Sequence, residues 1–137
     1  MTEEFVSEVK QIPHNDERIF SMLSDFSNLG RIKDLIPQDK IRNFKFDSDT
    51  CSFAVDPVGE ITFQIVEREP NNLIKFTVTN ALLPLFLWIQ LKQVAEDDTR
   101  LKITVRADMN PFLKLMVSKP LQEVVDKVSA FIASLPY

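Results

Sequence analysis

Apolar and polar residues alternate with a period of two along most of the chain up to residue 108, and the period then changes to that of a helix. The alternation predicts one strand over residues 4–12 and six more between residues 40 and 108, separated by short turns rich in Asp, Asn, Pro and Gly. The last strand has the most regular alternation, with Leu101, Ile103, Val105 and Ala107 on one side. Such strands form an antiparallel sheet with one buried face and one solvated face.

Helical spacing appears in three places. Asn15 is a good N-cap for a short helix that runs to Asp25, and Ser27 is suited to cap a second one that Pro37 ends. A long helix follows the sheet, with Asn110 as its cap and Pro111 in its first turn. One apolar stripe is predicted along this helix, formed by Leu113, Met116, Val117, Pro120, Leu121, Val124, Val128, Phe131, Ile132 and Leu135. Pro120 predicts a kink, because proline removes one helical hydrogen bond.

The order of these elements predicts an α+β fold in which a seven-stranded antiparallel sheet wraps around the long C-terminal helix, with two short helices between strands one and two. No repeat or linker divides the chain, so residues 1–137 are expected to form a single domain. The parity of the strands places fifteen apolar residues on the concave face: Phe5, Val9, Phe44, Phe46, Phe53, Val55, Ile61, Phe63, Ile65, Ile74, Phe76, Val78, Leu101, Ile103 and Val105.

Two stretches carry a family resemblance in addition to this order of elements. Residues 22–32, MLSDFSNLGRI, and residues 97–105, DDTRLKITV, resemble the join between the short helices and the entry to the last strand in the helix-grip superfamily. That superfamily, SRPBCC, contains START lipid-transfer domains, birch-pollen-allergen-like proteins and polyketide-cyclase-like proteins. Neither stretch is catalytic, and Ile32 stands where many such proteins carry Trp. The resemblance implies the fold, and members of this shape commonly keep a cavity between helix and sheet.

The apolar inner lining therefore favours a hydrophobic ligand site, although the same rings would also pack as a solid core. The residues expected to contact a ligand are Phe44, Phe46, Phe53, Phe63, Phe76, Leu113 and Met116. The loops at one end of the sheet carry apolar residues that would form a pocket rim, namely Val58, Leu82, Leu83, Met109 and Phe112. This rim could equally serve self-association or transient docking on a membrane, or fold inward over the core.

Catalytic chemistry has few candidates in the sequence. The parity places no Asp, Glu, Lys or His in mid-strand on the inner face, so no acid or base is expected there. Arg42 could reach the pocket but sits at a strand start, where an Arg usually turns to water. His14 and Cys51 are the only residues of their kinds, which gives no metal cluster and no disulfide within the chain. We therefore expect no catalytic residue, no metal and no cofactor.

Charge and hydropathy limit the partners. The formal net charge of −4 and the isoelectric point of about 5.0 have the wrong sign for binding nucleic acid. The longest apolar run, residues 81–91, is too short to span a bilayer, and the acidic N-terminus lacks a signal-peptide pattern, so a cytoplasmic protein without stable membrane insertion is expected.

The leading hypothesis is binding or transport of a lipid, polyketide-like or isoprenoid compound in an apolar cavity between the sheet and the C-terminal helix. The alternative is a protein-interaction or self-association module with a solid core. A homodimer would use Trp88 and Phe86, which oppose the parity of their strand. A cyclase-like or hydrolase-like enzyme ranks last.

Overall fold

The computed structural model describes residues 2–31, 42–55, 59–79 and 85–137. Its strands are β1 (Thr2–Val6), β2 (Lys10–Ile12), β3 (Arg42–Phe46), β4 (Thr50–Val55), β5 (Gly59–Glu69), β6 (Leu73–Thr79), β7 (Leu85–Ala95) and β8 (Asp98–Asp108). The helices are α1 (Asp16–Leu23), the 3-10 helix η1 (Phe26–Arg31) and α2 (Pro111–Ala133). The second predicted helix is thus a 3-10 turn as far as Arg31, and its predicted remainder lies outside the described residues.

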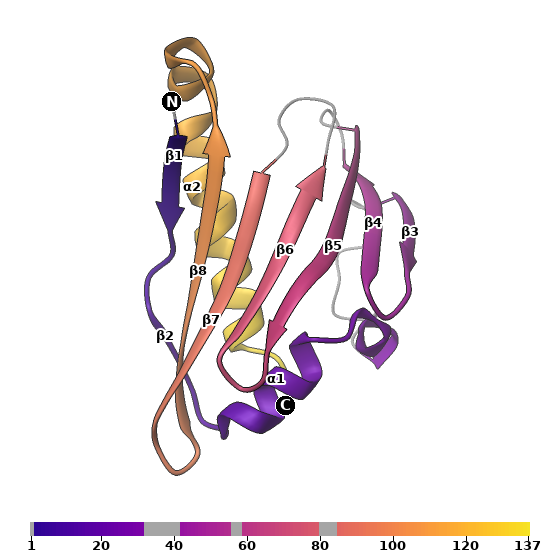
Figure 1. Ribbon diagram of the computed structural model, residues 1–137, viewed down its shortest axis with the longest axis vertical. Coiled ribbons are helices and arrows are strands. Elements are labelled where there is room, and N and C mark those ends of the chain that lie inside the picture. The colour runs from indigo at the N-terminus through magenta and orange to yellow at the C-terminus, as the bar shows by residue number, and fades with distance from the viewer. Residues whose placement is uncertain (1, 32–41, 56–58, 80–84) are drawn as a thin grey trace.

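The strands form one antiparallel sheet in the order β1-β8-β7-β6-β5-β4-β3, with β2 also paired to β8 (Figure 1). The predicted α+β architecture and the meander from β3 to β8 are confirmed. The registers put apolar residues opposite one another on the inner face, as in the pairs Ile74 with Ile89 and Ile89 with Ile103. Residues directly opposite in an antiparallel pair share a face, so these contacts build the core in layers.

The first predicted strand is divided into β1 and β2 by a departure from regular pairing at residues 7–9. Ser7 stays buried and takes over the pairing: its N–H donates to the Ile103 carbonyl at 2.8 Å, and its Oγ accepts from the Ile103 N–H at 2.9 Å. Val9, predicted to face the core, is instead 59% exposed. The alternation of faces holds only while the ladder is regular, which explains this error.

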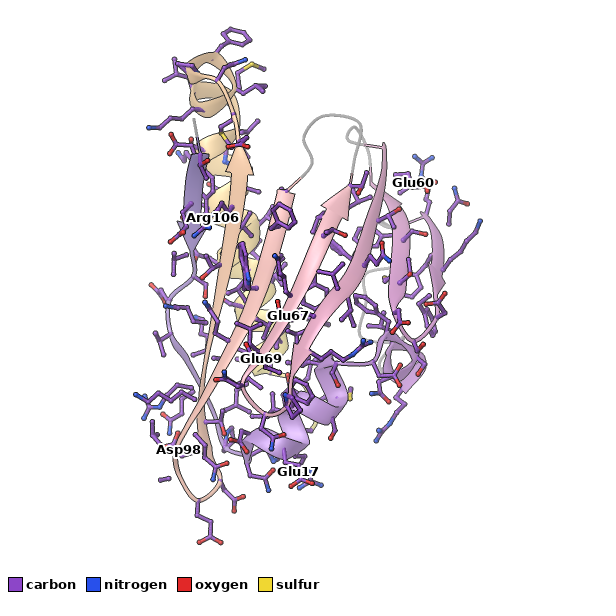
Figure 2. The ribbon with its side chains drawn as sticks, in the orientation of Figure 1. Glu17, Glu60, Glu67, Glu69, Asp98 and Arg106 are labelled. Atoms are coloured by element: carbon purple, nitrogen blue, oxygen red, sulfur yellow. The ribbon has the colours of Figure 1, made fainter. Side chains whose placement is uncertain are left out.

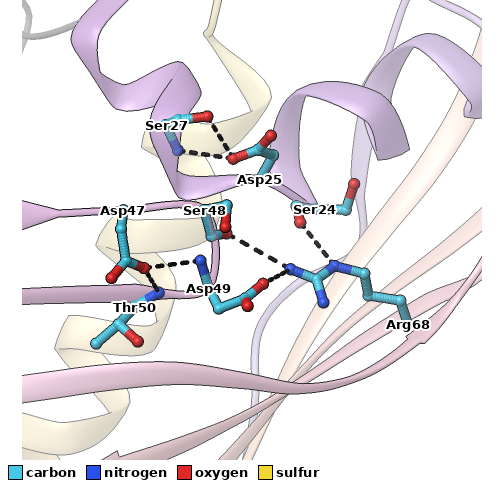
Figure 3. Close-up of polar contacts among 8 residues, drawn as sticks. All are labelled: Ser24, Asp25, Ser27, Asp47, Ser48, Asp49, Thr50 and Arg68. Atoms are coloured by element: carbon cyan, nitrogen blue, oxygen red, sulfur yellow. Dashed lines mark hydrogen bonds and ion pairs between the residues drawn. The ribbon is translucent and has the colours of Figure 1, made fainter.

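The short helices close one end of the sheet. Asn15 caps α1 as predicted, accepting a hydrogen bond from the Arg18 N–H at 2.8 Å. Arg68 holds the junction between α1 and η1, because its guanidinium donates to the Ser24 carbonyl at 2.9 Å and pairs with Asp49 at 2.6 Å (Figure 3). The Phe26 N–H also donates to the carbonyl of Ser48 at 3.1 Å. Together these bonds connect α1 and η1 to β5 and to the turn between β3 and β4.

Helix α2 runs along the side of the sheet formed by β1, β2 and β8, while β3 and β4 lie at the opposite side (Figure 1). The predicted caps are present, since Asn110 accepts from the Leu113 N–H at 2.9 Å and Pro111 opens the helix. The buried positions of α2 are Val125, Ser129 and Ile132. Pro120 lies within the continuous helix, and the kink expected there stays a prediction.

Ser7 provides a test of how the sheet tolerates its irregular first strand. Ser7→Ala removes the acceptor of the buried Ile103 N–H. An unsatisfied buried amide costs about 1–3 kcal/mol, so we expect the free energy of unfolding to fall by about that amount in urea titrations. Ser52→Ala is the matched control, because the Ser52 hydroxyl has no hydrogen-bond partner among the described residues. Equal stabilities of the two variants would contradict this role of Ser7.

Candidate ligand-binding site

A row of aromatic rings crosses the inner face of β3, β4 and β5. The ring centroids of Phe44 and Phe46 are 5.4 Å apart, those of Phe44 and Phe53 are 6.4 Å apart, and those of Phe53 and Phe63 are 5.6 Å apart. All four side chains are only half-buried. The row therefore offers apolar surface that the described part of the protein leaves partly uncovered.

Helix α2 presents a second uncovered apolar surface. Val124, Val128 and Phe131 recur at the spacing of one helical stripe and are exposed, Val124 by 53%. The buried residues Val125, Ser129 and Ile132 have the same spacing shifted by one position, which corresponds to a rotation of about 100° around the helix axis. The helix therefore docks on the sheet through one face, and the adjacent face stays partly exposed, Val128 by 37% and Phe131 by 36%. We call this partly exposed face the apolar flank of α2.

The sheet and the C-terminal end of the flank meet in a pocket of about 130 Å³, which we call the apolar pocket. The rings of Phe26 and Phe76 lie 5.7 Å apart and bring η1 against β6. The residues lining the apolar pocket are Met22, Leu23, Asp25, Phe26, Asn28, Leu29, Phe76, Ile89, Phe131, Ile132 and Leu135. An apolar cavity of roughly 150 Å³ is enough to hold a benzene ring, so this space accommodates a comparable fragment.

A larger and more open pocket of about 620 Å³ lies beside it, which we call the polar pocket. Its lining consists of Asn15, Glu17, Arg18, Ser21, Met22, Asn28, Arg31, Pro136 and Tyr137. Glu17 lies at this end of the molecule, whereas Glu60 lies at the opposite end of the sheet (Figure 2). Met22 and Asn28 belong to both pockets, so the two spaces adjoin.

The residues predicted to contact a ligand lie in several different parts of the structure. Phe44, Phe46, Phe53 and Phe63 form the aromatic row, while Phe76 is buried and lines the apolar pocket. Leu113 is half-buried against the core. Met116 is 58% exposed, because it lies on the side of α2 away from the docked residues. The proposed contact role of this set stays a prediction.

The predicted rim residues also separate. Met109 is only 4% exposed and belongs to the core. It therefore folds inward, which was one of the alternatives for the rim residues. Phe112 is 69% exposed in the first turn of α2. Val58, Leu82 and Leu83 lie outside the described residues. Arg42 is exposed and pairs in register with Ala54.

The sequence patterns did not reveal that α1 and η1 supply half of the apolar pocket. Met22, Leu23, Phe26 and Leu29 close it, and the signal was present in their apolar character at the ends of two short helices. Arg68 was missed as well. A register shift between Ile65 and Glu67 places Arg68 opposite the buried Ile74, and therefore on the inner face near the strand end.

Three ionisable groups on the inner face or beside the pockets have shifted pKa values. Burial raises the pKa of the Cys51 thiol to about 11 and also raises the pKa of the Tyr137 phenol, whose hydroxyl donates to the Ile132 carbonyl at 2.6 Å. Hydrogen bonds from the Ser27 hydroxyl and N–H lower the pKa of Asp25, so this carboxylate stays charged. In the described ranges, no three His, Cys, Asp or Glu side chains lie close enough to hold a metal ion.

Comparison with solved structures places this geometry among known folds. Norcoclaurine synthase from Thalictrum flavum, in complex with dopamine and hydroxybenzaldehyde, matches with a TM-score of 0.73 at 14% identity, over 100% of this chain and 90% of that chain. A START superfamily protein from Mycobacterium smegmatis matches with a TM-score of 0.58 at 12% identity, over 93% and 98%. An HSP90 activator from Plasmodium falciparum matches with a TM-score of 0.51 at 17% identity, over 77% and 71%.

These likenesses establish the fold: the chain has the helix-grip architecture of the START-like and birch-pollen-allergen-like proteins, as its sequence predicted. No family model and no curated protein matches the sequence itself. No helix in the described part of the chain is long and apolar enough to cross a membrane.

The reactivity of the Cys51 thiol tests directly whether this side chain is buried on the inner face of β4. With a pKa of about 11, roughly one Cys51 thiol in a thousand is ionised at pH 8, against about a quarter for an ordinary thiol. We expect alkylation by iodoacetamide at pH 8 to be at least about a hundredfold slower in the folded protein than in urea.

The raised pKa of Cys51 also determines how the stability of the protein changes with pH. Because folding raises the pKa of Cys51, the folded state favours the neutral thiol, and its contribution to stability is complete below the ordinary pKa and is lost as the pH rises toward 11. Cys51→Ser supplies the background in both experiments. Alkylation of the folded protein at the rate seen in urea would show that the thiol is not buried.

Proposed function

We propose that this protein binds a hydrophobic or amphipathic small molecule, such as a lipid, a polyketide-like or an isoprenoid compound, between the sheet and α2 and does not transform it. The observation that carries the proposal is the apolar flank of α2, because Val124, Val128 and Phe131 are exposed on a helix whose neighbouring face is buried. Exposed apolar surface of this kind usually marks a site of contact.

Two further features support the proposal. The aromatic row and the apolar pocket add apolar surface on the inner side of the sheet. Removing such surface from water contributes about 25 cal/mol per Å², so a ligand that covers a few hundred Å² gains enough free energy for micromolar binding after association entropy. The similar norcoclaurine synthase structure contains two small aromatic molecules, which is in keeping with a ligand of this kind.

A passive role agrees with the protonation states. Cys51 and Tyr137 are both held in their neutral forms, and a neutral thiol or phenol is a poor nucleophile or base. The Arg68 guanidinium, which lies near the inner face, is engaged in structural bonds to Ser24 and Asp49.

Substitutions on the apolar flank test the proposal. Val124→Asp places a carboxylate against the ligand at an exposed position of α2, so it should weaken binding of the neutral fluorescent probe N-phenyl-1-naphthylamine at least about tenfold while changing stability little. Leu115→Asp is the matched control, because Leu115 is exposed on the same helix but lies far from this stripe.

The measurement is the enhancement of probe fluorescence on titration with protein, followed by displacement with fatty acids and isoprenoid alcohols. Absence of probe binding to the unmodified protein, or equal effects of the two Asp variants, would contradict a ligand site along the flank.

A second candidate, self-association, is favoured by the outer face of the sheet. Phe86 is 43% exposed, and its ring lies 6.1 Å from that of Trp88. Lys75 lies 4.9 Å from the Phe86 ring centroid, and Arg106 lies 5.2 Å from that of Trp88. This aromatic surface with cations on both sides is suited to an interface between two copies.

Sedimentation velocity measures this directly. If the outer face forms a homodimer, the sedimentation coefficient rises with concentration between about 5 and 200 μM, and Phe86→Lys abolishes the rise by placing like charges together. The exposed control is Val94→Lys near the end of the same strand. A sedimentation coefficient independent of concentration would exclude this second function.

A further inference from the structure

The apolar and polar pockets adjoin and have two different chemistries. Met22 and Asn28 line both pockets, so a ligand that occupies the two spaces together would pass beside these two side chains. The surface of the apolar pocket is almost entirely apolar, and its volume is sufficient for a fragment of about the size of one ring. The polar pocket is larger and more open, so the part of a ligand that it receives keeps contact with water.

The lining of the polar pocket includes two arginines whose guanidinium groups have no partner among the described residues. The Arg18 backbone N–H donates to the Asn15 cap, but the guanidinium groups of Arg18 and Arg31 make no hydrogen bond or ion pair with any residue that the structure describes. The other arginines of the described chain are engaged: Arg68 with Asp49, Arg100 with Asp98, Arg106 with Glu4, and Arg42 in a contact of its own. Arg18 and Arg31 come from α1 and η1, so the fold brings them to one pocket from separate elements.

The side-chain charge of this lining is opposite in sign to that of the whole protein. Glu17 is the one acidic side chain among the described residues that line the polar pocket, against two arginines. The chain as a whole carries a formal net charge of −4. Asn28 is held in place at the shared boundary, since its side-chain amide donates to the carbonyls of Ser21 and Met22 at 3.1 Å. Arginine is well suited to bind a carboxylate, because its planar group offers paired donors.

From these observations we propose that the ligand is a compact amphipathic carboxylic acid. Its ring or short aliphatic segment lies in the apolar pocket against Phe76 and Phe131, and its carboxylate lies in the polar pocket between Arg18 and Arg31. This inference rests on the proposed function and specifies the ligand's chemical class. Binding is governed by burial of the apolar segment, while the two arginines select an acid over a neutral compound of the same shape.

A matched pair of ligands tests the inference: 4-phenylbutanoate, and 4-phenylbutan-1-ol as its neutral counterpart. Isothermal titration calorimetry at low salt should show the acid binding at least about fivefold more tightly than the alcohol. Arg18→Gln and Arg31→Gln should each weaken binding of the acid about fivefold and leave binding of the alcohol unchanged. Glu17→Gln should strengthen binding of the acid, and raising the salt to about 0.5 M should reduce the preference.

Two controls separate the pockets. Lys92→Gln removes an exposed cation that lines neither pocket and should affect neither ligand. Phe131→Ser reduces the apolar lining and should weaken both ligands alike. Thermal unfolding of each variant confirms that the fold is retained; Arg18 and Arg31 are exposed, so their replacement is compatible with folding.

The outcomes distinguish this inference from the proposed function. Equal affinity for acid and alcohol, or acid binding unaffected by both arginine substitutions, would overturn the inference and leave the proposed function intact. Binding of N-phenyl-1-naphthylamine without binding of either phenylbutyl compound would do the same. Failure of the neutral probe to bind would instead reject the proposed function.

Discussion

The docking of α2 through a narrow face is the constraint on which the candidate site depends. Val125 and Ser129 are small, and their burial brings the helix onto β1, β2 and β8 at one side of the sheet. Because α2 packs against β1, β2 and β8 at one edge of the sheet, it cannot also cover the strands at the other edge. The face of α2 that is rotated by about 100° from the buried face therefore contacts less protein. That face carries Val124, Val128 and Phe131, and its exposure is a direct consequence of where the buried face docks.

The other side of the pocket depends on polar bonds. Arg68 links the end of α1 to the turn between β3 and β4, and within that turn the Asp47 carboxylate accepts from the N–H groups of Asp49 and Thr50 at 2.9 and 2.8 Å (Figure 3). These contacts keep η1 close to β6, where Phe26 meets Phe76. The apolar pocket therefore exists between a helix fixed by hydrophobic burial and a short helix fixed by hydrogen bonds.

The sequence predicts the elements well and the docking poorly, for physical reasons. Strand parity and helix caps depend on neighbouring residues, so the meander, Asn15 and Asn110 are all recognisable. Val9 departed from its expected face, and Arg68 was not predicted to lie on the inner face, because irregular pairing shifts the alternation in a way that composition does not reveal. The predicted apolar stripe of α2 was wrong as a docking face, because its members Met116, Val124 and Val128 are exposed while Val125 and Ser129 are buried. Two adjacent faces of a helix can both be apolar, and only tertiary packing decides which one docks.

The uncovered flank also has an energetic consequence. The apolar area that Val124, Val128 and Phe131 leave exposed contributes nothing to folding, so the native state lacks the stabilisation that covering this area would supply. Any molecule that covers them binds the folded chain and not the unfolded one, and so raises stability in proportion to the logarithm of its concentration. A charged head group adds little to this energy where water remains close, but it decides which apolar molecule is retained. In the complex with an amphipathic acid that we propose, the apolar lining would supply affinity, and Arg18 and Arg31 would supply selectivity.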